Sequence, residues 1–142
     1  MATRVHKLLS REDKARLRHL VEALEQETGA EIAVLMVPHV DDPEQFATTY
    51  FNHVGIGKRE HNNGVLILVV VDRRRVRIEV GHGLETLVTK GAADRIITDV
   101  MAPEFRRGRY GEGVLRGVEA IAVLVRGAHR PSAPPSTPAA GR

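Results

Sequence analysis

The apolar positions of the chain predict a small protein in which helices alternate with strands. Apolar residues recur at helical spacing between a capping residue, Ser10, and a helix stop, Gly29. Short apolar runs at 30–38 and 65–71 predict two buried strands, and the strict alternation of polar and apolar residues over 75–80 predicts a half-exposed third strand. Because a tight turn joins the last two segments, the third strand should run antiparallel to the second.

A helix is expected between the two buried strands. It should begin at Pro43, capped by Asp41 or Asp42, and run to about His53. A strand, a helix and a second strand form a crossover unit, which joins parallel strands and is almost always right-handed. The first two strands should therefore lie parallel in one sheet.

The C-terminal half contains two further helical patterns. A third helix is expected to open at Thr89 or Lys90 and to end at Pro103. Residues 104–113 are interpreted as a loop, and a last helix follows over 114–125. This order predicts an α/β fold, a three-layer α/β/α sandwich around a small mixed sheet.

Composition predicts where the folded domain ends, and the distribution of charge indicates which classes of partner to expect. Residues 1–127 should form one domain, while 128–142, rich in proline, serine and alanine, should form a disordered tail. The net charge is +3, but three of the 21 basic and none of the 18 acidic residues lie in 126–142, so the body of the chain is balanced. We therefore expect no nucleic-acid partner, and the arginine run at 72–77 is interpreted as a solvated hairpin tip.

The chain contains no cysteine, which excludes thiolate metal sites. Its longest apolar run is far shorter than the ~20 residues of a membrane helix, and its N-terminus shows no apolar leader. From these patterns we expect no signal peptide, no membrane span and a cytoplasmic location.

The turn between the second and third strands predicts a register. If Val71 pairs with Val76, then Ile67 lies opposite Val80. Extending the same register brings the segment 61–64 next to 81–86 at one edge of the sheet. The sequences that meet there are "HNNG" and "GHGLE".

This predicted corner offers two explanations. Amide oxygens of Asn62 and Asn63 and the carboxylate of Glu85 are hard ligands that suit calcium or magnesium. Alternatively, the asparagines accept left-handed backbone angles and the glycines allow two loops to cross closely. His82 and His61 also fall in this region, although no histidine pair in the chain has the i, i+4 spacing of a helical zinc site.

The same stretch resembles a dinucleotide-binding fingerprint only superficially. Gly81 and Gly83 match the first two glycines of G-x-G-x-x-G, but Thr86 stands in the place of the third. The fingerprint also belongs in the turn from a parallel strand to a helix, whereas Gly81 follows a strand expected to be antiparallel. We therefore do not expect nucleotide binding.

Two long stretches of the chain resemble the TPM domain family, also called the TPM phosphatase family. They are "NNGVLILVVVDRRRVRIEVGHGLE" and "AADRIITDVMAPEFRRGRYGEGVLRGVEAI". The resemblance implies an α/β/α sandwich. Thylakoid members of this family are described as acid phosphatases involved in photosystem II repair. Several bacterial members look like divalent-cation binders, and animal relatives modulate receptors without known catalysis.

Three positions depart from the family's pattern. Asn62 replaces an aspartate, Lys90 replaces another aspartate before the third helix, and His82 replaces a tyrosine. The first two changes remove negative charge, which weakens the expected affinity for hard cations.

The resemblance leads to two hypotheses of function. In the first, the chain is a weak, cation-assisted, acid-phosphatase-like hydrolase of phosphomonoesters: Asn62, Asn63 and Glu85 hold calcium or magnesium, and His82 acts with Glu85 in catalysis.

In this hypothesis, Arg106 or Arg107 would bind the phosphate bidentately. In the second hypothesis the chain is a non-catalytic module that binds a protein partner and assists assembly or repair of a membrane complex, with any cation being structural.

Overall fold

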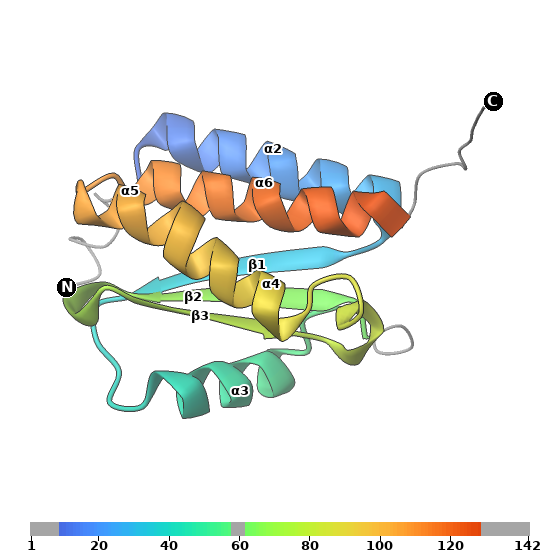
Figure 1. The fold of residues 1–142 in the computed structure, drawn as a ribbon, viewed down its shortest axis with the longest axis horizontal. Helices are drawn as coiled ribbons and strands as arrows, with labels where there is room; N and C mark the ends of the chain where they lie inside the picture. The colour runs from blue at the N-terminus through green and yellow to red at the C-terminus, as the bar shows by residue number, and fades with distance from the viewer. Residues whose placement is uncertain (1–8, 58–61, 129–142) are drawn as a thin grey trace.

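The computed structural model describes residues 9–57 and 62–128, which form a three-layer α/β/α sandwich (Figure 1). In chain order the elements are α2 (Arg11–Thr28), β1 (Glu31–Val37), α3 (Pro43–Val54), β2 (Gly64–Val70), β3 (Arg75–Val80), α4 (Lys90–Arg95), α5 (Ala102–Arg106) and α6 (Tyr110–Ala128). Short 3₁₀ turns η1 (Val71–Arg73) and η2 (His82–Leu84) flank β3, and a π-helical segment η3 (Ile96–Met101) joins α4 to α5. The predicted order of helices and strands is confirmed.

Local sequence signals fix where the helices begin. Ser10 and Asp13 form a complete capping box, in which the Asp13 N–H donates to Ser10 Oγ at 3.0 Å. Asp42 accepts a hydrogen bond from the Gln45 N–H and precedes Pro43, and Thr89 caps α4 in the same way.

The sheet has the order β1-β2-β3, with β1 parallel and β3 antiparallel to the central strand β2. Strand β2 is buried along its whole length because helices cover both of its faces. Strand β1 was also expected to be buried, which is wrong for most of its residues: it is an edge strand and is mostly half-buried.

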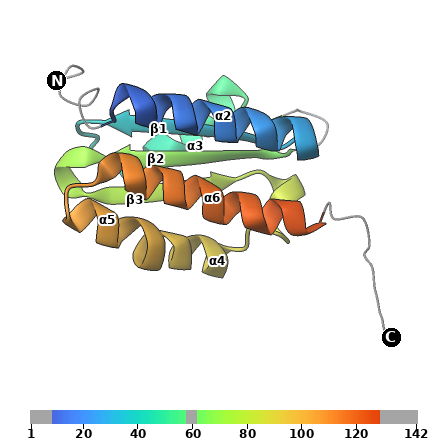
Figure 2. The ribbon, with the colours of Figure 1, turned by 90° about the horizontal axis from the view of Figure 1, so that it is seen from above.

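Side chains of β2 alternate between two cores. Val65, Ile67 and Val69 pack in the larger cluster with α2, α4 and α6, while Leu66 and Leu68 pack in a smaller cluster with α3. Figure 2 shows α2 above β1, and α4 and α5 beyond α6 on the side of β3.

The predicted register between β2 and β3 is wrong by two residues. Val65 lies opposite Val80 and Ile67 opposite Ile78, instead of opposite Val80. The turn begins one residue earlier than expected, because Val71 leaves the ladder and its carbonyl accepts the N–H of Arg74, which has a left-handed φ of 54°. A shift of two residues keeps every side chain on its expected face.

Pro103 does not end the third helix, and most of 104–113 is helical. The helix continues through η3, where the N–H of Ala102 bonds to the carbonyl of Ile97, five residues back. Pro103 then lies in the first turn of α5, where its missing N–H costs little. The connection to α6 is limited to Arg107–Arg109.

Candidate functional site

The glycine-rich segments around β2 and β3 meet, as the sequence predicted, at one end of the sheet. The Gly81 N–H donates to the Gly64 carbonyl at 2.8 Å, and the Gly83 N–H donates to the Asn62 carbonyl at 2.9 Å. These bonds extend the β2–β3 register beyond the strands. We call this region the glycine corner and define it by Gly57, Asn62, Asn63, Gly64 and Gly81.

Close backbone contacts explain the glycines of this corner. A Cβ on Gly57 would lie 2.4 Å from the Gly64 nitrogen, and one on Gly64 would lie 2.4 Å from the Ile56 oxygen. A Cβ on Gly81 would lie 2.3 Å from the Asn62 oxygen. Any larger residue therefore requires the backbone to move.

The two asparagines also have structural roles here. Asn62 has a φ of 51°, a left-handed conformation that asparagine tolerates better than most residues. The Asn63 side chain donates from Nδ2 to the Gly29 carbonyl at 2.7 Å and so holds the end of α2. These contacts match the structural explanation of the corner.

His82 and Glu85 lie together at the surface, next to the glycine corner. His82 Nδ1 is 3.1 Å from Glu85 Oε2, and the two side chains are 85% and 54% exposed. In the part of the chain that the structure describes, no group of three or more His, Cys, Asp or Glu side chains is arranged to hold a metal ion. His61 lies outside the described residues.

The two proposed phosphate-binding arginines lie far from this pair. Arg106 and Arg107 are exposed at the end of α5, whereas His82 and Glu85 precede the start of α4 (Figure 1). The helical run between them, from Lys90 to Arg106, is roughly 24 Å long at the rise of a helix. The structure therefore does not bring the predicted residues together in one site.

A groove lies between β3 and α4, and Glu85 is one of the residues that line it. One part, of about 320 Å³, has an apolar floor that includes Ile78, Val88 and Ala93. A second part, of about 390 Å³, continues towards Pro43 and Glu44 at the start of α3. Both parts are lined by Arg77, Asp94 and Ile97, so they form one groove along the strand.

Strand β3 presents unpaired backbone groups along this edge of the sheet. In an antiparallel pair, every second residue of a strand directs its backbone N–H and C=O groups to the neighbouring strand. Gly81 and Gly83 bond to the β2 side, so the residues that alternate with them along β3 direct their backbone groups away from β2. The outward residues are Val76, Ile78 and Val80. Within 9–57 and 62–128, their outward N–H and C=O groups have no hydrogen-bond partner.

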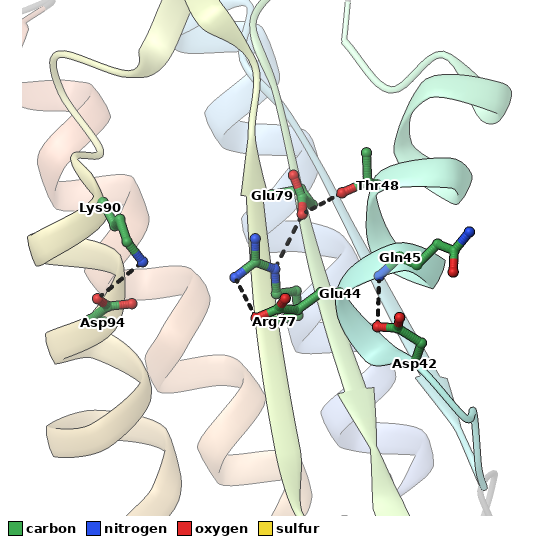
Figure 3. Close-up of polar contacts among 8 residues, drawn as sticks. All are labelled: Asp42, Glu44, Gln45, Thr48, Arg77, Glu79, Lys90 and Asp94. Carbon is green, nitrogen blue, oxygen red and sulfur yellow. Dashed lines mark hydrogen bonds and ion pairs between the residues drawn. The ribbon is translucent and has the colours of Figure 1, made fainter.

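Charged side chains form the rim of the groove (Figure 3). Arg77 Nε lies 3.2 Å from Glu79 Oε2, which also accepts a hydrogen bond from Thr48 Oγ1 at 3.1 Å. On α4, Lys90 Nζ lies 3.7 Å from Asp94 Oδ2. The ammonium group of Lys90 thus already neutralises a nearby carboxylate.

The opposite end of the sheet holds a different titratable cluster. His39 Nε2 lies 2.9 Å from Asp41 Oδ1, and its Nδ1 lies 2.6 Å from Asp72 Oδ2. The hydrogen bonds to Asp41 and to Asp72 raise the pKa of His39 above its ordinary value. This contact ties the end of β1 to the β2–β3 turn.

Sequence reasoning missed the groove residues Arg77, Glu79 and Asp94. One signal was available: the polar and apolar residues of 75–80 alternate, and this alternation, absent from the wholly apolar run 65–71, is typical of a strand that is not covered on both faces. The position of α4 beside this strand depends on tertiary packing and had no comparable signal.

The chain belongs to the TPM domain family, whose model matches residues 3–124. The N-terminal domain of a protein from P. gingivalis is 37% identical, with a TM-score of 0.79 over 85% of this chain and 78% of that chain. A protein of the psychrophilic bacterium Bizionia argentinensis is 22% identical, with a TM-score of 0.72 over 84% of this chain and 82% of that one. The N-terminal domain of a Corynebacterium glutamicum protein is 15% identical, with a TM-score of 0.63 over 94% and 82%.

The last two similarities concern the fold alone. No curated protein gives a significant match. Among the described residues, no helix has the length and apolar character needed to cross a membrane. The cytoplasmic location stays a prediction.

Proposed function

We propose that this TPM domain is a binding module that takes up an extended segment of a protein partner along the open edge of β3. The observation that carries the proposal is the row of outward backbone groups at Val76, Ile78 and Val80 beside a groove. An extended peptide that adds to a sheet edge gains its affinity from such main-chain hydrogen bonds.

Main-chain hydrogen bonds alone do not select a particular peptide sequence, and the groove beside β3 would provide this selectivity by contacting the side chains of the peptide. Alternate side chains of an added strand point to opposite faces. One set would meet the apolar floor at Ile78 and Ala93, and the other would meet the charged pair Arg77 and Glu79. The preferred partner segment is therefore extended, with aliphatic residues at every second position and polar residues between them.

Weak, cation-assisted phosphatase activity is the second candidate, supported by the contact between His82 and Glu85 at the mouth of the groove. Three observations weigh against it. The bond from Nδ2 to the Gly29 carbonyl fixes the orientation of the Asn63 amide, and Lys90 neutralises Asp94, so this carboxylate adds no net negative charge for a cation. Arg106 and Arg107 also lie too far away to bind the same phosphate.

Selection from a library of random peptides tests the proposal. Selected peptides should show alternating aliphatic residues and should shift the amide resonances of Val76, Ile78 and Val80. Asp94 lines both parts of the groove, so Asp94→Trp would fill part of each with a large side chain. This substitution should weaken the binding of a selected peptide at least tenfold.

Asp99→Trp is the matched control, since Asp99 is an exposed aspartate of the same helical run that does not line the groove. Equal effects of the two substitutions, or amide shifts away from β3, would contradict the proposal. Turnover of a phosphomonoester by pure protein that requires added calcium or magnesium and disappears in Glu85→Ala would support the second candidate instead.

A further inference from the structure

Two arginine-rich turns that are distant in sequence lie side by side at one end of the molecule. Arg73 and Arg74 lie in the turn between β2 and β3, and Arg75 begins β3. Arg106 ends α5, and Arg107 and Arg109 lie in the turn that leads to α6. Both views of the fold place these turns at the same end, opposite the glycine corner (Figures 1 and 2). We call this group of six residues the arginine end.

The charges of the arginine end are largely available for a partner. All six side chains are exposed. Arg107 and Arg109 share the buried carboxylate of Glu104, at 4.0 and 3.7 Å. The other four have no ion-pair partner in the described part of the chain. The nearby carboxylate of Asp72 is already bound to His39.

We propose that the arginine end docks on the surface of a membrane that contains anionic lipids. Guanidinium groups bind phosphate oxygens in a planar, bidentate manner, and lipid head groups present many phosphates in one plane. Two turns at the same end of a domain can contact such a plane together. This inference does not rest on the proposed peptide groove. Of the six arginines only Arg75 also lines the groove, and it is left unchanged in the test below.

The composition of the two turns favours a membrane surface over a nucleic acid. Between Arg73 and Arg75, and between Arg106 and Arg109, the only residue that is not arginine is Gly108. No aromatic side chain is available there to stack on a base, because Phe105 and Tyr110 are buried. The turns also lack apolar side chains that could insert between lipid tails, so docking should be electrostatic and sensitive to salt.

Binding to lipid vesicles tests the proposal with the full chain. At low salt the protein should bind vesicles that contain about one third phosphatidylglycerol and should not bind pure phosphatidylcholine. The triple substitution Arg73→Gln, Arg74→Gln, Arg106→Gln should weaken binding roughly 100-fold, since each basic residue near an anionic surface contributes about one factor of five. High salt should abolish binding.

The control carries Arg18→Gln, Arg95→Gln and Arg126→Gln, which lower the net charge equally but lie elsewhere on the fold. It should lose only a few-fold in affinity. The control also loses the exposed ion pair between Arg126 and Glu27, which contributes little to stability, so both triple variants should remain folded in the binding assay. Equal losses in the two variants, no binding to anionic vesicles, or tighter binding to RNA than to vesicles at the same salt would each overturn the proposal.

Discussion

The glycine corner and the β3 groove lie close together, but one is closed and the other is open. In the corner, backbone meets backbone at Gly57, Gly64 and Gly81, and both asparagines are used to hold the chain. In the groove, β3 leaves its outward backbone groups unpaired beside an apolar floor. The glycine motif, which is easy to recognise in the sequence, therefore has a structural role in the corner. The neighbouring edge of β3 keeps backbone groups that can bind a partner.

The largest expected effect is in the closed region. Gly81→Ala should lower the free energy of unfolding by about 3 kcal/mol, because its Cβ would meet the Asn62 carbonyl at 2.3 Å. Urea unfolding measures this loss. Gly91→Ala is the control: its nearest neighbour would be Arg95 Nη1 at 3.7 Å, so stability should be unchanged or rise by up to about 1 kcal/mol.

Proline substitutions in β3 distinguish its bonded side from its open side. Arg77 belongs to a bonded pair with Leu68, so Arg77→Pro should cost roughly 2–3 kcal/mol by leaving a buried carbonyl unpaired. Val76→Pro removes an outward N–H and part of a half-buried side chain, so it is compared with Val76→Ala, relative to which it should cost no more than about 1 kcal/mol. Arg77→Ala reports the contribution of the side chain alone. Equal costs for the two prolines would show that the assigned open side of β3 is wrong.

Asn63→Asp separates the two explanations of the corner. Without its Nδ2 donor, the Gly29 carbonyl would face a carboxylate, and the unfolding free energy should fall by about 2 kcal/mol. Adding calcium should not restore it. If Asn63 were a metal ligand, the new carboxylate would strengthen calcium binding, and calcium would raise the stability of the variant above that of the wild type.

The smallest effect concerns His39, at the other end of the sheet from the corner. The pKa of His39 in the folded chain is raised above its ordinary value of 6.5. The protonated imidazole therefore stabilises the fold fully below pH 6.5. This stabilisation is lost as the pH rises through the pKa of the folded chain. An NMR titration should show the pKa of His39 falling in Asp41→Asn and in Asp72→Asn. It should not change in Asp99→Asn, and an unchanged pKa in both of the first two variants would contradict the assigned contacts.

The features that the sequence predicted correctly depend on local chemistry. Ser10, Asp42 and Thr89 are capping residues whose partners lie within three residues, and the buried run of β2 is apolar throughout. The meeting of the glycine segments was also predictable, because a hairpin register that is wrong by two residues still brings the same loops together.

The features that were missed depend on contacts between distant segments. The β2–β3 turn begins at Val71 where the Asp72 N–H bonds to the carbonyl of Pro38 at 3.1 Å, and His39 binds the Asp72 side chain. The π turn in η3 allows a helix to continue past Pro103, and no local signal identified it. The groove and the arginine end likewise require tertiary structure to place residues from separate elements side by side.

Amide hydrogen exchange along β3 tests the central claim most directly. In the free protein, the amides of Arg77 and Glu79 should be protected, while those of Val76, Ile78 and Val80 should exchange faster. A saturating concentration of a library-selected peptide should protect the three outward amides. Outward amides that are already protected in the free protein, or that remain unprotected when the peptide is bound, would contradict the account of β3 as an open edge that binds an extended partner.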